Sequence, residues 1–348
     1  MKKILTVYTG GTICSVANGK MRSLSPKEAP KVLPAVFSQS SSPYAASADL
    51  LFEDSAFPEE KMLLSENMTP LAWQTLLDHL GKFSLEDYAG VILLHGTDTL
   101  AYTAGLLSFW FAQTPVPFML VSGNRPPSDP QSNAHANFRT AVELILQDIS
   151  PNVYVPYRNC DGTLWLHAGA RLTQCPECSE DFLPIGAQRI SLDENGTALL
   201  PALPAQKVVT AWPALSPCKP LSSAGVLVVH PYTGLDYTHI DLHNIHVVLH
   251  GTYHSGTVCA LNNASPYSVF PFAERCRQKG IPLFVAPCVL NEEQYASAHG
   301  LFANSSAIPL PMTLPAAYGK VLTALACGIP REELTAFMRH GVNGELLG

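Results

Sequence analysis

Short apolar runs alternate along the first half of the chain with longer segments that have helical periodicity. The runs are rich in β-branched residues and lack regular polar positions, which is typical of strands buried on both faces. They lie at residues 4–8, 90–94, 118–121 and 153–155. Helices are predicted over 69–80, where Thr69 suits the N-cap and Pro70 the first turn, and over about 133–146. The pattern predicts an α/β fold with a mostly parallel sheet and helices on both faces.

The chain changes character in its middle. Proline recurs through residues 199–220, which predicts a linker and not a regular element. Three further apolar runs follow at 225–229, 246–249 and 282–285. We therefore expect two domains: a larger N-terminal α/β domain over residues 1–200, a Pro-rich linker over 201–221, and a smaller parallel α/β domain over 222–348.

Composition and charge narrow the class of function. Of the 348 residues, 47% are hydrophobic and 14% are charged, which excludes a disordered chain. The net charge of −7 gives no basic surface for nucleic acid or anionic lipid. We therefore expect a small-molecule partner, with no nucleic acid and no membrane. The nine cysteines are odd in number and scattered, and the first apolar run is too short for a signal peptide, so a cytoplasmic location is expected.

A glycine-rich turn directly follows the first predicted strand. Thr9-Gly10-Gly11-Thr12-Ile13 combines two residues that permit a sharp backbone turn with a hydroxyl at the carboxyl end of a parallel strand. This arrangement favours either an oxyanion site with a nucleophile or a dinucleotide-binding turn. The second interpretation lacks the G-x-G-x-x-G pattern.

A second polar turn follows the strand at 90–94. His95-Gly96-Thr97-Asp98-Thr99 places two hydroxyls and a carboxylate ahead of a segment with the pattern of a helix. Either threonine would also serve as the helix N-cap with Asp98 in the first turn, which is a purely structural interpretation. Because both polar turns follow parallel strands at their carboxyl ends, we expect them to share one crevice.

Together the two turns resemble the signatures TGGTI and HGTDT of the bacterial-type L-asparaginase family. Both are intact here, in that order and about 85 residues apart. Two further segments are similar to family motifs, Ser65-Glu66-Asn67-Met68-Thr69-Pro70 and Ser122-Gly123-Asn124-Arg125-Pro126, and weaker matches lie at 168–174 and 343–346. The chain looks most like the cytoplasmic type I branch.

The resemblance implies a two-domain asparaginase fold and a homodimer or homotetramer. It also implies hydrolysis of L-asparagine, or of a related small amide, to the acid and ammonia through a threonine nucleophile, without a cofactor or metal. The catalytic residues that carry over are Thr12, Thr97 and Asp98, and the substrate-binding residues are Gly11, Ser65, Glu66 and Gly96. Among these, Gly11 matches the backbone that holds the oxyanion.

Two positions depart from the family pattern. Gln174 stands where the family has a lysine that pairs with the aspartate of HGTDT, and glutamine supplies neither a positive charge nor a proton acceptor. The loop after TGGTI lacks the family's tyrosine, and Lys20 falls near that position. We therefore name Lys20, Gln174 and His254 as candidate members of a rebuilt proton relay. The alternative is that Lys20 is a solvated lysine and His254 an ordinary loop histidine.

Other functions stay open at this point. The same pocket would suit an amino-acid-binding protein without turnover, or an amidase for a different small amide. Cys175-Pro176-Glu177-Cys178 has the spacing of redox and zinc sites, although two thiolates fall short of the four ligands of structural zinc. The related amidotransferase that acts on misacylated tRNA is disfavoured, because there is no basic patch and no additional domain before TGGTI.

Overall fold

The chain forms two compact units, Met1–Val208 and Val209–Gly348. The structure, a computed structural model, describes residues 2–18, 21–25, 29–203, 218–223, 225–261, 265–288 and 295–347. Lys20 and most of the predicted linker over 201–221 lie outside the described residues. No helix in these ranges is long and apolar enough to cross a bilayer.

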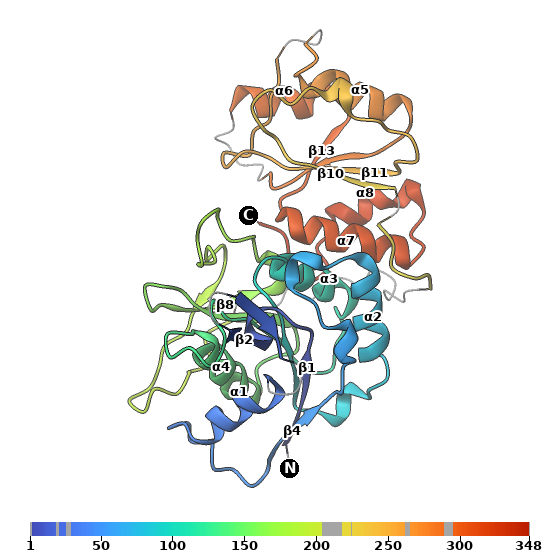
Figure 1. The fold of residues 1–348 in the computed structure, drawn as a ribbon. Helices are drawn as coiled ribbons and strands as arrows, with labels where there is room; N and C mark the ends of the chain where they lie inside the picture. Colours follow the sequence, from blue (N-terminus) through green and yellow to red (C-terminus); the bar gives the residue numbers. More distant parts are fainter. Residues whose placement is uncertain are drawn as a thin grey trace. The chain divides into compact units, whose positions relative to one another are not determined.

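The first unit is built on a seven-stranded sheet (Figure 1). The strand order is β4-β1-β5-β6-β7-β8-β9, with parallel pairing from β4 to β7 and antiparallel pairing of β8 and β9. The strands span Lys2–Tyr8 (β1), Leu50–Asp54 (β4), Gly90–Leu94 (β5), Phe118–Val121 (β6), Val153–Arg158 (β7), Leu164–Ala168 (β8) and Gln188–Arg189 (β9). A separate hairpin pairs Ser15–Asn18 (β2) with Met21–Leu24 (β3). The predicted mostly parallel sheet is confirmed.

Helices cover both faces of this sheet. They span Ala29–Ser38 (α1), Pro70–Leu80 (α2), Leu100–Trp110 (α3) and Ala134–Leu146 (α4). Phe37 of α1 packs edge-on against Phe138 of α4, with ring centroids 6.4 Å apart, whereas Trp73 of α2 donates a hydrogen bond to Thr103 of α3. Figure 1 shows these two pairs of helices on opposite sides of the sheet. The Thr69 hydroxyl accepts a hydrogen bond from the Ala72 N–H at 3.2 Å, so the predicted cap of α2 is confirmed.

The second unit is a smaller parallel sheet between two helical layers. Its order is β10-β11-β12-β13, with strands Val226–Val229 (β10), Val247–His250 (β11), Leu283–Val285 (β12) and Ala307–Pro309 (β13). The helices are Val269–Gln278 (α5), Ala296–Asn304 (α6), Leu314–Ala326 (α7) and Arg331–Arg339 (α8). Along β11, Val248 joins the apolar cluster of α5 and α6, while Val247 and Leu249 join that of α7 and α8. The sheet is therefore buried on both faces, as its uniformly apolar strands predict.

Candidate active site

The two polar turns begin where two adjacent parallel strands end. β1 pairs with β5, with Tyr8 opposite Leu94, so residues 9–12 and 95–98 leave the same edge of the sheet. The Thr9 N–H and the Thr9 hydroxyl both donate to the Leu94 carbonyl, at 3.1 and 2.7 Å. The first turn is therefore fastened to the neighbouring strand at its starting residue.

Close contact between the turns requires glycine. A Cβ atom on Gly11 would lie 2.2 Å from the Gly96 Cα atom, and one on Gly10 would lie 1.9 Å from the Leu63 carbonyl oxygen. Gly10 and Gly11 also have positive φ angles, of 120° and 75°. Residues with a side chain rarely adopt such angles. These glycines allow the two backbones to touch.

A pocket of about 520 Å³ opens where the turns meet. Four of the residues expected from the sequence line it: Thr12, Thr97, Asp98 and Gln174. The rest of its described wall consists of Asn124, Tyr157, Cys175, Pro176, Cys178, Ser179 and Glu180. The volume is within the range of small-molecule sites. Both hydroxyl-bearing turns thus open into one pocket.

Thr12 and Thr97 present their polar groups to this pocket unpaired. Thr12 begins the short 3-10 helix η1 (Thr12–Cys14). Within the described ranges, neither hydroxyl and neither backbone N–H has a hydrogen-bond partner. The Gly11 N–H, by contrast, donates to the Leu63 carbonyl at 2.8 Å. This donor is already used within the protein. The match of the Gly11 backbone to the family's oxyanion-holding backbone stays a prediction.

Ser65 connects its own segment to Asp98. Ser65 lies in the 3-10 helix η3 (Ser65–Asn67) and is buried. Its hydroxyl donates to Asp98 Oδ2 at 3.1 Å and accepts from the Asp98 N–H at 3.2 Å. The Thr99 hydroxyl donates to the Ser65 carbonyl at 2.9 Å. Ser65 therefore orients the Asp98 carboxylate, whereas Glu66 is exposed and is not among the wall residues of the pocket.

A chain of hydrogen bonds holds His95 behind the second turn. Trp73 Nε1 donates to Thr103 Oγ1 at 2.9 Å, and the Thr103 hydroxyl lies 2.9 Å from His95 Nε2. His95 Nδ1 lies 2.7 Å from the Gly96 carbonyl, which only accepts, so the ring proton is assigned to Nδ1. Burial lowers the pKa of His95 to about 4. The neutral ring therefore positions the Gly96 peptide and is not poised to exchange protons.

Replacing Thr103 by valine is expected to lower the free energy of unfolding by about 1–3 kcal/mol, because Trp73 Nε1 and His95 Nε2 lose their buried partner. Urea unfolding measures this change. Thr75→Val is the matched control, since the Thr75 hydroxyl donates to the Leu71 carbonyl at the exposed side of the same helix pair. The control should change by less than about 0.5 kcal/mol. Equal losses of unfolding free energy in the two variants would contradict the role assigned to the hydrogen bonds that link Trp73, Thr103 and His95.

Gln174 approaches Asp98 from another segment of the first unit. Its Nε2 donates to the Asp98 backbone carbonyl at 2.5 Å. Its Oε1 is buried and has no hydrogen-bond partner in the described part of the chain. Gln174 thus lies beside the residue that the family's lysine is expected to serve, but it holds the backbone and not the carboxylate.

The other two candidates for the proton relay are not among the described wall residues of the pocket. His254 belongs to the second unit, where it is exposed in the loop after β11. Lys20 lies outside the described residues. The relay role of both stays a prediction.

Comparison with known proteins identifies the family. The family profile described as "Asparaginase, N-terminal" matches residues 3–180, which is half of the chain and includes every described residue of the pocket. The chain belongs to the asparaginase family. This membership supports an asparaginase-like amidohydrolase.

Curated relatives of this asparaginase-family chain have more than one function. L-asparaginase from Thermococcus kodakarensis is 32% identical over 158 residues, which is 44% of this chain and 44% of that protein. A component of the glutamyl-tRNA(Gln) amidotransferase from Haloquadratum walsbyi is 36% identical over 138 residues, which is 39% of this chain and 31% of that protein. The matched segments span less than half the length of these relatives.

Solved structures share the fold over the full chain. The thermostable L-asparaginase from Thermococcus kodakarensis superposes with a TM-score of 0.75 at 20% identity, covering 99% of both chains. L-asparaginase I from Vibrio cholerae gives 0.72 at 20% identity, covering 100% of this chain and 99% of the other. The two-unit asparaginase fold expected from the two signatures is therefore confirmed.

Seven wall residues of the asparaginase-family pocket were not named as site residues from the sequence, and Asn124, Tyr157 and Glu180 are three of them. Asn124 Nδ2 donates to Glu180 Oε2 at 2.9 Å, and the Tyr157 hydroxyl donates to the Glu180 carbonyl at 2.9 Å. Asn124 follows β6 within the segment similar to a family turn, which was an available signal. The sequence around Tyr157 and Glu180 contained no such signal, because only the folded loop brings these residues to the pocket.

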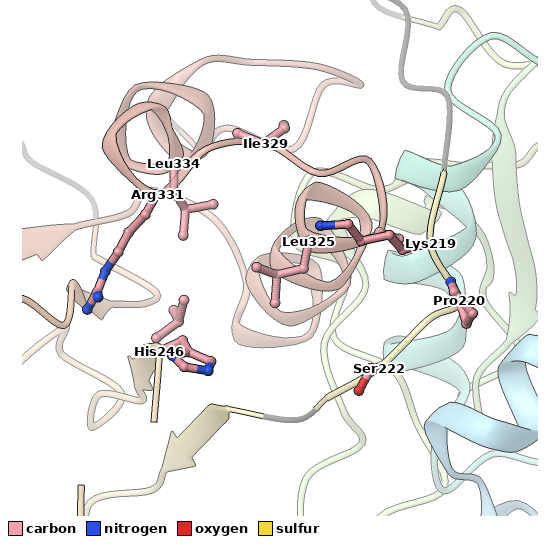
Figure 2. Close-up of a pocket in the computed structure, with 10 residues that line it drawn as sticks. Lys219, Pro220, Ser222, His246, Leu325, Ile329, Arg331 and Leu334 are labelled. Atoms are coloured by element: carbon pink, nitrogen blue, oxygen red, sulfur yellow. The ribbon is translucent and has the colours of Figure 1, made fainter. Parts of the chain in front are cut away.

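The second unit has a cavity of its own, of about 360 Å³ (Figure 2). It lies between α7, α8 and the segments that precede β10 and β11. Figure 2 shows the apolar side chain of Leu325 between Lys219 and His246, and that of Leu334 beside Arg331. Its described wall contains no carboxylate and no threonine hydroxyl. The pocket of the first unit holds Thr12, Thr97 and Asp98 of the two signatures, so it is the candidate active site. Across the described ranges, no three His, Cys, Asp or Glu side chains gather as metal ligands.

Proposed function

We propose that this protein hydrolyses L-asparagine, or a related small amide, to the acid and ammonia, with Thr12 as the nucleophile. The observation that carries the proposal is the common pocket of Thr12, Thr97 and Asp98, in which both threonine hydroxyls lack a partner among the described residues. A hydroxyl that makes no hydrogen bond to the protein can approach a bound carbonyl without first losing one. We further propose a cytoplasmic homo-oligomer that needs no cofactor.

The proposed reaction has two displacements. The Thr12 hydroxyl attacks the amide carbon, ammonia leaves, and water then hydrolyses the acyl-enzyme. Thr97 and Asp98 assist proton transfer in both steps, with Ser65 orienting the Asp98 carboxylate. The backbone N–H groups of Thr12 and Thr97, which have no partner in the described ranges, are the proposed donors to the oxyanion.

An ammonia-release assay tests this function. Purified protein is supplied with asparagine, glutamine and small amides that lack the α-amino or the α-carboxyl group. Release from asparagine above all other amides supports the proposal. Release only from amides without an α-carboxyl group would reassign the substrate, and no release from any amide would contradict hydrolysis.

A second candidate function is binding without turnover. The contact of Gln174 with the Asp98 carbonyl favours it, because an uncharged side chain stands where the family has a lysine. Stabilisation of the protein against heat by asparagine and aspartate, together with no ammonia release, would select this alternative. Stabilisation with ammonia release would reject it.

Gln174→Lys is expected to raise ammonia release by about tenfold or more. A lysine ammonium beside the exposed Asp98 carboxylate would supply the missing positive charge and, when deprotonated, a general base. The measured quantity is kcat for asparagine. Gln174→Met is the matched control, since it has a similar length but no charge. A lysine variant no faster than the methionine variant would show that position 174 does not limit proton transfer.

A further inference from the structure

Two cysteines of the C-x-x-C motif form part of the candidate active-site wall. Cys175 and Cys178 line the same pocket as Thr12, Thr97 and Asp98. Cys178 is exposed and Cys175 is partly buried, and both thiols are free. The spacing alone did not indicate this location, and the proposed hydrolysis uses neither sulfur.

The loop that carries the pair is fixed to the pocket on both sides of the two cysteines. Immediately before Cys175, Gln174 donates to the Asp98 carbonyl. Two residues after Cys178, Glu180 accepts hydrogen bonds from Asn124 and Tyr157. The sulfurs therefore stay in the wall and are not carried away on a free loop.

A tight turn presents Cys178 to solvent. The Ser179 N–H donates to the Pro176 carbonyl at 3.1 Å, and Cys178 has a φ of 58°. Few residues other than glycine adopt this left-handed angle, because it brings the Cβ atom close to the backbone. Backbone strain of this kind concentrates at functional sites.

We propose that Cys175 and Cys178 are a thiol modification site that reacts with small disulfides such as glutathione disulfide and thereby closes the candidate active site. The expected loss of activity on closure of the pocket rests on the proposed function. The ligand class follows from the chemistry of two free thiols in an open pocket large enough for a small molecule.

The reaction proceeds by thiol–disulfide exchange. The Cys178 thiolate attacks one sulfur of the small disulfide, a Cys178–S–S–R bond forms, and one R–S⁻ leaves and takes up the proton that Cys178 lost. Cys175 can then attack the Cys178 sulfur, which forms a Cys175–Cys178 disulfide and releases the second R–SH. The two cysteines are oxidised by two electrons and the small disulfide is reduced to two thiols.

Exposure and charge set the order of the two steps. Cys178 is the accessible sulfur. Burial, together with the carboxylates of Asp181 and Asp98, raises the pKa of the Cys175 thiol to about 12, so little thiolate forms there at neutral pH. Cys178 therefore reacts with the small disulfide first, and Cys175 attacks the resulting mixed disulfide afterwards. The mixed disulfide already places a bulky group in the pocket.

Peptide mapping by mass spectrometry after treatment with glutathione disulfide tests the site. The expected result is a glutathione adduct on Cys178, or a disulfide between Cys178 and Cys175, that dithiothreitol removes. Cys160 and Cys218 are exposed cysteines outside the pocket wall and serve as internal references. Modification confined to these two cysteines would overturn the proposal.

Function is measured on the same samples. Ammonia release should be lost on treatment and return with dithiothreitol. Cys178→Ser protein should keep its own untreated rate after treatment, whereas Cys160→Ser protein should respond as the wild type does. Modification of Cys178 with an unchanged rate would overturn the closure.

A third measurement separates this inference from the proposed function. Hydrogen exchange of the peptide that contains Thr97 and Asp98 should slow when the adduct fills the pocket, whether or not the protein releases ammonia. Slowed exchange in a protein without amidohydrolase activity would keep the thiol site and reject the proposed function. Unchanged exchange in a protein with Cys178 fully modified would reject closure of the pocket by this thiol and leave the proposed function untouched.

Discussion

Thr12→Ala is expected to abolish ammonia release, with a fall in kcat of about 10³-fold or more, as is usual when a covalent nucleophile is removed. The substitution deletes the hydroxyl oxygen that forms the acyl bond. Thr12 makes no side-chain hydrogen bond within the described residues, so the fold should lose little stability. The measurements are ammonia release and the thermal midpoint with and without aspartate.

Thr12→Ser is the matched control for this experiment. Serine keeps the hydroxyl and removes only a methyl group, so its rate should exceed that of the alanine variant by a large factor. Aspartate should still stabilise the alanine variant against heat, because the remaining pocket wall is intact. A rate in Thr12→Ala close to that of the wild type would show that another residue attacks the amide.

The parts of the fold that could be predicted are those whose sequence pattern is determined locally. The runs at 90–94 and 118–121 coincide with β5 and β6, because every side chain on these strands is buried and apolar. β4 was missed, since Leu50–Asp54 lies at the sheet edge and three of its five side chains are exposed or charged. β8 and β9 were also missed. They pair antiparallel, and antiparallel strands do not need the uniformly apolar runs by which the parallel strands were predicted.

The candidate site divides in the same way. The two polar turns could be located because each directly follows a strand, and adjacent parallel strands carry their turns to one edge. The Cys175–Glu180 side of the pocket could not, because its place depends on hydrogen bonds to Asp98 and Asn124, which are distant in sequence. The hydrogen bond from the Gly11 N–H to the Leu63 carbonyl could not be predicted either, since Leu63 lies on a separate segment.

His250 shows why a motif alone does not identify chemistry. It ends β11 in the second unit and is followed by Gly251, as His95 is followed by Gly96. His250 Nδ1 lies 2.5 Å from the Gly251 carbonyl, and His250 Nε2 pairs with the Tyr237 hydroxyl at 2.8 Å. Burial lowers its pKa to about 4. Both histidines are therefore best understood as supports for a strand-end peptide.

Glu345→Gln is expected to lower the free energy of unfolding by about 3–5 kcal/mol, because it removes the carboxylate that pairs with the buried Lys320 ammonium. The two side chains are fully buried, and Lys320 Nζ lies 2.6 Å from Glu345 Oε1. The ammonium also donates to the Met338 and His340 carbonyls, which carry only partial charge. Chemical unfolding of the two-unit protein, followed by a probe in the second unit, measures the change.

Two control variants separate the buried charge from the loss of a side-chain contact. Lys320→Met combined with Glu345→Gln removes both charges, so it should recover a large part of the stability that the single variant loses. Glu333→Gln removes an exposed carboxylate on α8 and should change stability by less than about 0.5 kcal/mol. A double variant as unstable as the single one would show that loss of the ion pair is not the cause.

Acid should distinguish the same variants. Burial alone would raise the pKa of Glu345, but the Lys320 ammonium and the hydrogen bonds donated by backbone N–H groups outweigh it and hold that pKa below its usual range. An unfolded chain has a glutamate pKa of about 4.3. Between the two values the unfolded chain binds the proton, so this contribution is complete above pH of about 4.3 and is lost as the pH falls through the folded pKa. The wild type should therefore lose its stability advantage over Glu345→Gln on acidification, and a constant difference down to pH of about 2 would contradict a titrating pair.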